Sequence, residues 1–153
     1  MSTMKSLLST LLGASSKLST VETAVVDCVR GQLDAGMVYL WDGQVQAINK
    51  IQRLPEGVEV NFYRIKSGRP SFPEDLSFPN KAKELLLAKV RLEVPSLQGK
   101  LDAKVWCVAG FLFSIEYAGS VSYFEEAAGM DPRPEFKVSC ELTADLALAA
   151  GQD

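Results

Sequence analysis

The sequence contains no histidine. Imidazole is the commonest general acid and base near neutral pH and the commonest metal ligand in proteins. Its absence excludes the hydrolases whose serine or cysteine nucleophile is activated by histidine, and every metal site that requires an imidazole. Carboxylates remain the one catalytic chemistry with any local concentration in the chain, and they could also hold a hard cation.

The motifs that bind phosphate or carry an exposed nucleophile are also missing. Neither G-x-x-x-x-G-K-[ST] nor G-x-G-x-x-G occurs, and there is no G-x-S-x-G. These absences argue against nucleotide binding by the usual loops and against the common hydrolase mechanism. These absences favour a non-catalytic protein without deciding the question, and we expect no cofactor and no metal.

Cysteine is scarce, and the three that occur are an odd number with no Cys-x-x-Cys pair. Each lies in a hydrophobic pattern, which predicts buried free thiols in a reducing compartment. The first residues imitate a secretory signal, but serine and threonine interrupt their apolar run, so an amphipathic helix is the better interpretation. No hydrophobic run approaches the roughly 18 to 20 residues of a membrane span. We expect a cytoplasmic protein.

Positive charge is in slight deficit, because 16 lysines and arginines face 19 aspartates and glutamates, a formal charge of −3. This balance argues against a protein that neutralises a nucleic-acid backbone. A chain of 153 residues fits one globular domain. We expect residues 1–153 to form it, with residues 1–18 as a peripheral helix and linker and residues 144–153 as a fraying tail.

The most hydrophobic stretch, residues 104–117, reads KVWCVAGFLFSIEY. Its β-branched and aromatic residues with one central glycine predict two strands joined by a bend or bulge. In the second strand the pattern places Phe111, Phe113, Ile115 and Tyr117 on one face. We interpret this stretch as the core around which the fold is organised.

Two helices are expected before the first strand. Apolar residues at residues 4–12 recur with helical spacing. Ser19 and Glu22 then have the spacing of a capping box, and an apolar stripe follows to Leu33, before a glycine that favours helix termination. In this second helix Glu22 and Asp27 are expected to face solvent.

A β-hairpin is predicted over residues 37–48, because Asp42 and Gly43 are the dipeptide of a tight turn between two apolar segments. Trp41 and Asp42 near that turn are candidate contacts for a partner, although Trp41 also suits the rim of a core. A further strand is expected over residues 58–65, where apolar and polar residues alternate.

The middle of the chain gives a mixed signal. Phe72 and Phe78 stand in a proline-rich loop that is expected to be anchored on the core. Asn80 can cap a helix reaching about Leu92, but residues 89–94 alternate as a strand does. We favour the helix and keep the strand as the alternative.

The last third predicts a strand over residues 120–124, an acidic loop over residues 125–134 and a strand over residues 136–142. Aromatic residues stand beside acids in this part, a composition that complements a basic protein partner. Together with Trp41 and Asp42, the candidate binding residues are Tyr117, Tyr123, Phe124, Glu125, Glu126, Met130 and Asp131.

The order of these elements predicts an α+β fold, with a mostly antiparallel sheet of about five to six strands and with N-terminal helices and one mid-chain helix packed on one face. The leading hypothesis for function is a non-catalytic protein that binds another, basic protein, in the manner of a chaperone or of an immunity protein that neutralises a toxin. Two alternatives stay open. One is a small-molecule-binding protein or a carboxylate-based enzyme with its pocket between sheet and helices, in which Glu116 is the best residue. The other is a structural subunit that forms a homo-oligomer.

Overall fold

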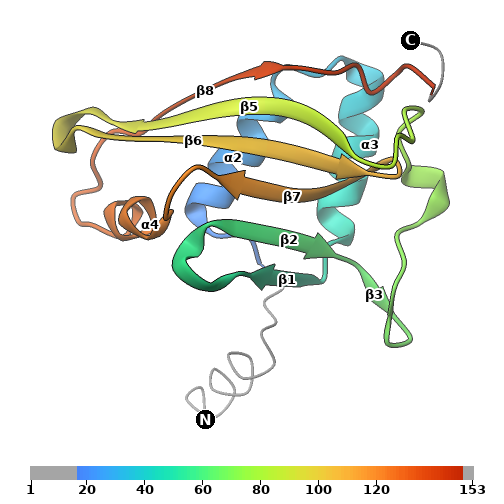
Figure 1. Cartoon of the computed structure of the whole chain (residues 1–153), viewed down its shortest axis with the longest axis horizontal. Coiled ribbons are helices and arrows are strands. Elements are labelled where there is room, and N and C mark those ends of the chain that lie inside the picture. The colour runs from blue at the N-terminus through green and yellow to red at the C-terminus, as the bar shows by residue number, and fades with distance from the viewer. Residues whose placement is uncertain (1–16, 150–153) are drawn as a thin grey trace.

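The computed structural model describes residues 17–149. Two helices precede an antiparallel sheet of six strands, and a third helix lies between the last two of these strands in the chain (Figure 1). This confirms the expected α+β class, the antiparallel sheet and the helices before the first strand. The helix expected over residues 4–12 lies outside the described residues, and the extent of the single domain stays a prediction.

Helix α2 spans Thr20–Arg30 and begins with the predicted capping box. The Ser19 hydroxyl accepts a hydrogen bond from the Glu22 amide at 3.1 Å, and the Glu22 carboxylate accepts one from the Ser19 amide at 2.8 Å. Two amides at the helix start are satisfied in this way. The helix ends at Gly31, earlier than predicted, and Asp34 then caps the next helix.

The hairpin predicted over residues 37–48 is wrong, because helix α3 spans Ala35–Ala47. The carboxylate of Asp34 accepts a hydrogen bond from the Met37 amide at 3.0 Å, as an N-cap does. Gly43, expected in a turn, lies within the helix, where a Cβ atom would stand 2.8 Å from a methyl carbon of Leu76. The glycine therefore allows the neighbouring segment to pack closely on α3.

Gln44 attaches α3 to the end of the sheet. Its side-chain amide donates hydrogen bonds to the carbonyl groups of Leu76 at 2.7 Å and Gly110 at 3.0 Å. Its side-chain oxygen accepts a hydrogen bond from the Leu112 amide at 2.8 Å. Gln44, Gly110 and Leu112 are buried and Leu76 is half-buried, so these bonds satisfy backbone groups that are shielded from water wholly or in part.

The main sheet has the strand order β1-β2-β7-β6-β5-β8, and all neighbouring strands are antiparallel. Its strands are β1 Lys50–Arg53, β2 Glu59–Tyr63, β5 Leu85–Val94, β6 Gly99–Val108, β7 Phe111–Tyr117 and β8 Lys137–Leu142. A separate small ribbon pairs β3 Ile65–Lys66 with β4 Arg69–Pro70. Three short 3₁₀ turns are η1 Pro55–Gly57, η2 Glu74–Leu76 and η3 Pro95–Leu97.

Strands β6 and β7 confirm the two strands predicted over residues 104–117, but a tight turn joins them in place of the expected bend or bulge, and they pair as an antiparallel hairpin with an irregular register. The turn places Ala109 and Gly110 at φ angles of 51° and 94°, a region that glycine enters at little steric cost. Leu112, Ile115 and Tyr117 are buried, whereas Phe111 and Phe113 are half-buried. The prediction of one continuous alternating face is wrong, because the register shift changes the direction of the side chains along β7.

The prediction that favoured a helix over residues 80–92 is also wrong. Strand β5 confirms the alternative read from residues 89–94. The side chain of Asn80 accepts a hydrogen bond from the Ala82 amide at 3.1 Å and so supports a local turn. Because β5 lies between β6 and β8, its backbone groups are paired on both sides, and sheet pairing prevails over the local capping signal.

The strand predicted over residues 120–124 is helix α4, which spans Ser122–Ala128. Phe124, Ala127 and Ala128 are buried at helical spacing. The packed helix that follows the first strands is therefore α4, late in the chain, and not the mid-chain helix that was expected.

The loop over residues 71–79 is anchored as predicted. Phe78 is fully buried, and its ring stacks on Trp41 with 6.3 Å between the ring centroids. Phe72 stacks on Phe111 at 5.1 Å. Both phenylalanines of this loop therefore contribute to packing.

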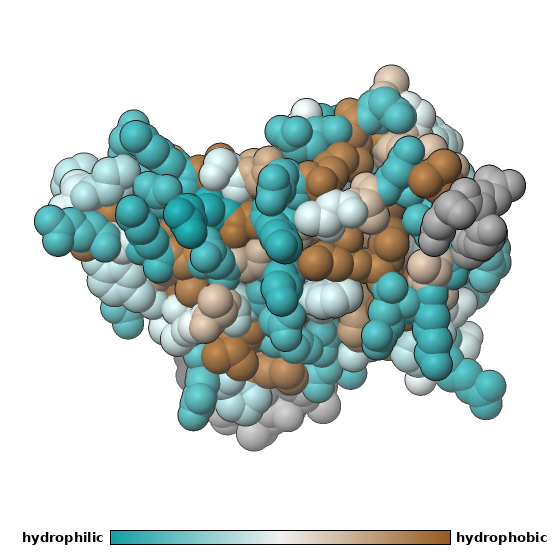
Figure 2. Space-filling model, turned by 45° about the horizontal axis from the view of Figure 1, so that its top comes forward, coloured by the Kyte–Doolittle hydropathy of each residue, from teal (hydrophilic) through white to brown (hydrophobic). Residues whose placement is uncertain are grey.

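Helices α2 and α3 lie behind the sheet in Figure 1, so one face of the sheet is covered and the face toward the viewer is open. An oblique view of that side shows hydrophobic atoms between rows of hydrophilic ones, most densely in the half where β6 ends and β7 begins (Figure 2). Among residues 17–149, no helix is long and apolar enough to cross a membrane.

Candidate functional site

Two hollows in the surface of residues 17–149 are candidate sites. One, which we call the sheet groove, lies over the open face of β8, β5, β6 and β7 and has a volume of about 810 Å³. The other, which we call the α4 cleft, lies between the start of α2, the turn from β1 to β2, and α4, and has a volume of about 410 Å³. Tyr117 contributes to the lining of both.

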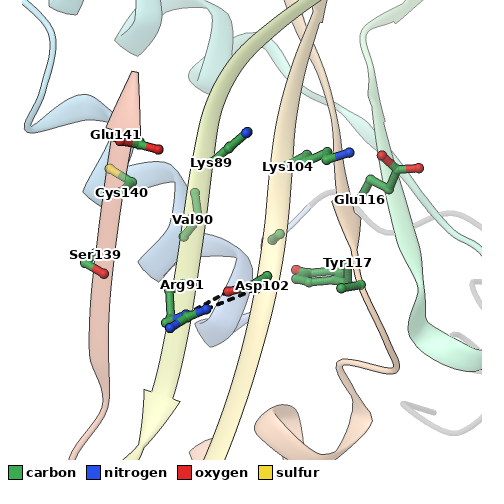
Figure 3. Close-up of a pocket in the computed structure, with 12 residues that line it drawn as sticks. Lys89, Val90, Arg91, Asp102, Lys104, Glu116, Tyr117, Ser139, Cys140 and Glu141 are labelled. Carbon is green, nitrogen blue, oxygen red and sulfur yellow. Dashed lines mark hydrogen bonds and ion pairs between the residues drawn. The ribbon is translucent and has the colours of Figure 1, made fainter. Parts of the chain in front are cut away.

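Charges in the sheet groove balance one another (Figure 3). Its lining has three cationic side chains and three carboxylates, namely Lys89, Arg91, Lys104, Asp102, Glu116 and Glu141. Arg91 donates two hydrogen bonds to Asp102, at 2.8 and 3.2 Å. Strand register places Lys104 directly beside Glu116. The groove therefore presents no excess charge of either sign to a ligand.

Glu116 was the best residue for an enzyme or small-molecule site. It lies on the open face, and its carboxylate accepts a hydrogen bond from the Trp106 indole at 3.1 Å. The sheet partner on its other side is Glu59. The sheet groove is broad and has no second carboxylate placed in a distinct, enclosed environment, which is what acid and base catalysis by two carboxylates requires.

The α4 cleft is smaller and has a different chemistry. Its lining residues are Glu22, Arg53, Leu54, Gly57, Glu59, Val60, Tyr117, Val121, Ser122, Glu125 and Glu126. Four of them are carboxylates and one is a guanidinium, so the formal charge of the lining is 1 − 4 = −3.

Glu22 forms the deepest charged contact of the α4 cleft. Only 3% of its surface is exposed, which contradicts the prediction that it faces solvent. Both of its carboxylate oxygens accept hydrogen bonds from Arg53, at 2.9 Å each. These bonds raise the pKa of the Arg53 guanidinium above its ordinary value. Glu22 is thus neutralised by Arg53, and the other three carboxylates give the cleft its excess negative charge.

Tyr117, which lines the α4 cleft, carries an unpaired polar group. The tyrosine is 5% exposed, and its buried hydroxyl oxygen has no hydrogen-bond partner among residues 17–149. Burial, followed by the negative charges of Glu22 and Glu125, raises the pKa of this hydroxyl above its ordinary value. The hydroxyl therefore stays protonated at neutral pH. A buried group of this kind costs free energy unless something binds to it.

The carboxylates of the α4 cleft can attract a cation, and the buried Tyr117 hydroxyl becomes an acceptor for it once the side chains that cover the hydroxyl move aside. Among the described residues, no group of three or more side chains is placed to hold a metal ion. An ammonium or guanidinium group, which needs several hydrogen-bond acceptors and no fixed coordination geometry, fits this arrangement better.

Three candidate residues from the sequence come together in the α4 cleft: Tyr117, Glu125 and Glu126. Tyr123 lies in α4 with Glu125 and Glu126 but does not line the cleft. Its hydroxyl donates a hydrogen bond to the Leu97 carbonyl at 3.3 Å. The ring of the buried Phe124 meets the ring of Tyr123 edge to face. Met130 and Asp131 are exposed in the segment after α4.

The remaining candidates lie in α3, away from the cleft. Trp41 is fully buried in the core, so its indole is not available at the surface. Asp42 accepts hydrogen bonds from Arg30 at 2.7 and 2.8 Å, and the ion pair joins α3 to the end of α2. Hydrogen bonding by Arg30 lowers the pKa of Asp42 below its ordinary value.

Sequence reasoning did not find Glu22, Arg53 and Glu59 as members of one site. Glu22 was recognised as part of a capping box, and that was the one local signal it carried. The three residues come from α2, β1 and β2, and only the packing of α2 against the sheet brings them to α4. Comparison with models of protein families, with curated proteins and with solved structures found no significant match.

Proposed function

We propose that this protein is a non-catalytic binding protein whose α4 cleft accepts a lysine or arginine side chain of another protein. The observation that carries the proposal is the combination of excess carboxylates with the buried, unpartnered hydroxyl of Tyr117 in one cleft. A cationic side chain would be attracted by Glu125 and Glu126 and would provide a donor for the Tyr117 oxygen.

The cleft suits an extended side chain better than a folded surface. Its volume of about 410 Å³ exceeds that of one long side chain, and Leu54, Val60 and Val121 provide apolar lining for its methylene groups. Glu59 is half-buried and Glu126 is exposed, so both acids remain available for neighbouring positive charges of the same segment. A basic segment of a protein therefore matches the cleft in shape and in charge.

A protein with this function acts by shielding or escorting its partner. The partner need not be modified, so the missing histidine and missing nucleotide loops are consistent with the proposal. We propose a cytoplasmic location, where the usual state of cysteines is the free thiol that all three have in this structure.

The direct test uses a pentalysine peptide and isothermal titration. Wild type should bind it, and affinity should fall as salt is raised from about 50 to 500 mM, because screening weakens exposed charge pairs. The double variant Glu125→Gln/Glu126→Gln should lose at least about tenfold in affinity, because two attractive charges are removed. The matched control is Glu84→Gln/Glu135→Gln, which changes the net charge equally at exposed acids outside the cleft.

Three results would contradict the proposal. Equal losses in the two double variants would show attraction by net charge alone. Unchanged affinity in the cleft variant would place the peptide elsewhere. If spermidine or lysine amide binds as tightly as the peptide, a small amine and not a protein segment is the ligand, and the small-molecule alternative takes its place.

A second candidate is self-association through the open sheet face. The specific observation is that Trp106 and Phe113 are half-buried on a sheet whose charged groups balance, so a second copy would meet no net repulsion there. Sedimentation over a hundredfold range of concentration tests it. A dimer that is lost in Trp106→Glu but kept in Tyr39→Glu, an exposed position on α3, would support this candidate. A concentration-independent monomer would end it.

A further inference from the structure

Two cysteines that are far apart in the sequence are in direct contact. Cys28 in α2 and Cys140 in β8 have their sulfur atoms 3.1 Å apart, and the Cys28 thiol donates toward the Cys140 sulfur. Both are free and only partly buried. The third cysteine, Cys107, is 1% exposed in the core and belongs to β6.

The geometry leaves little movement before the two sulfurs could be joined. A disulfide has its sulfur atoms about 2.05 Å apart, so the side chains would have to approach by about 1 Å. Each belongs to a regular element, and α2 packs directly on β8. The backbone therefore already holds the two side chains toward one another, and their partial exposure gives a small oxidant access.

We propose that Cys28 and Cys140 are a redox modification site, at which a reversible intramolecular disulfide ties α2 to the edge strand β8. The expected oxidant is a low-molecular-weight disulfide such as oxidised glutathione. Disulfides that form under cytosolic conditions are usually transient and redox-sensing.

The exchange balances in two steps. The deprotonated Cys28 sulfur attacks one sulfur of the oxidant, forming a mixed disulfide and releasing one reduced thiol. The Cys140 thiol then loses its proton to solvent and attacks the Cys28 sulfur, which releases the second reduced thiol. Two protein thiols are oxidised by two electrons, and one disulfide is reduced to two thiols.

The order of attack follows from the surroundings of Cys140. Burial, together with its contact to Cys28, raises the pKa of the Cys140 thiol to about 12. Few Cys140 thiolates are then present at neutral pH, which disfavours Cys140 as the first nucleophile. In the second step its target is held beside it, and this proximity compensates for the small thiolate fraction.

The bond would restrict α2, the helix that carries Glu22 of the α4 cleft. It would close a long loop between residues 112 positions apart, and such cross-links stabilise chiefly by restricting the unfolded chain. The proposal does not depend on peptide binding, so its outcome is independent of the proposed function.

The test uses the purified full chain, first reduced and then exposed to oxidised glutathione. Intact mass spectrometry should show a loss of about 2 Da in a monomer, as two hydrogens leave on disulfide formation. Digestion without reduction should yield a peptide pair linked through Cys28 and Cys140. The melting temperature should rise on oxidation and return on reduction. Cys107→Ser should behave as wild type, whereas Cys28→Ser and Cys140→Ser should not lose this mass.

Other products would overturn the inference. A stable glutathione adduct without closure would show that the two sulfurs do not reach one another. Linkage to Cys107, linkage between two chains, or no reaction while both thiols are alkylated in the folded protein would also contradict it. The linked peptide is read from wild type, so the result does not depend on whether the serine variants fold.

Discussion

Glu22 holds Arg53 through both carboxylate oxygens while it also caps the first turn of α2. Through these two roles, Glu22 connects the start of α2 to strand β1, which follows α3 in the chain. The contact forms one wall of the α4 cleft, so the stability of the fold and the shape of the candidate site depend on the same carboxylate.

Replacing Glu22 with glutamine should destabilise the fold. Glutamine can still complete the capping box, so the change removes mainly the negative charge that faces Arg53. A fully buried pair broken in this way costs about 3 to 5 kcal/mol. The Arg53 side chain is 41% exposed, so solvent screens its charge. We therefore expect the free energy of unfolding to fall by about 1 to 2 kcal/mol.

Denaturant unfolding measures this loss. Asp27→Asn, at an exposed position of the same helix, is the control and should change stability by less than about 0.5 kcal/mol. A Glu22→Gln protein as stable as wild type would show that Arg53 does not depend on this partner.

Replacing Gln44 with leucine should be more damaging. Leucine has a similar volume but leaves the Leu112 amide and the carbonyl groups of Leu76 and Gly110 without these bonds. Buried unsatisfied groups cost about 1 to 3 kcal/mol each, and we expect a total loss of about 3 kcal/mol because the segment can partly relax. Gln46→Leu, exposed on the same helix, is the control. If both variants unfold at the same denaturant concentration, α3 is not attached to the sheet as described.

Replacing Tyr117 with phenylalanine should separate stability from binding. Within the part of the chain that the structure describes, the hydroxyl has no hydrogen-bond partner, so its removal should leave the free energy of unfolding unchanged or raise it by about 1 kcal/mol. Pentalysine binding should nevertheless weaken, because the cation loses an acceptor. A marked loss of stability would mean that the hydroxyl is already satisfied within the fold.

The ion pair between Arg91 and Asp102 gives a pH-dependent prediction. Hydrogen bonds from Arg91 lower the pKa of Asp102 below its ordinary value of 3.8. Because the folded-state pKa is below the unfolded one, the pair stabilises the fold above the unfolded value, and this contribution disappears as the pH falls through the folded value.

The difference in melting temperature between wild type and Asp102→Asn should therefore be small at pH 7 and absent in strong acid. Both side chains are more than half exposed, at 51% and 59%, so about 1 M salt should also reduce the difference. A difference that persists when Asp102 is protonated would assign the effect to packing.

Some elements follow directly from local sequence. The capping box of Ser19 and Glu22 correctly placed the start of α2, and the apolar stretch around Gly110 correctly predicted the two strands that became β6 and β7. In both cases the stabilising interactions are between near neighbours in the chain. Alternation over residues 136–142 likewise predicted a strand with one solvated face, and the structure places it as β8 at the edge of the sheet.

Local signals failed where tertiary packing selects the structure. Asp42 and Gly43 resemble a turn, yet the N-cap at Asp34 and the buried side of α3 favour a helix. The helical pattern of α4 depends on Ala127 and Ala128, whose small side chains give a weak hydrophobic signal. The candidate site was predictable only in part. Glu125 and Glu126 are adjacent in the chain and could be found from the sequence, whereas packing alone brings them close to Glu22.

Binding of a cationic segment in the α4 cleft can be located residue by residue through chemical-shift mapping of labelled protein titrated with pentalysine. We expect saturable shifts centred on the backbone amides of Gly57, Val121 and Glu125, which line the cleft. Shifts centred on Lys89 and Ser139 in the sheet groove would contradict binding in the α4 cleft. The absence of shifts at peptide concentrations up to about 1 mM would also contradict it, because a complex with a Kd of about 1 mM, which has a binding free energy of about −4 kcal/mol, would still be detected.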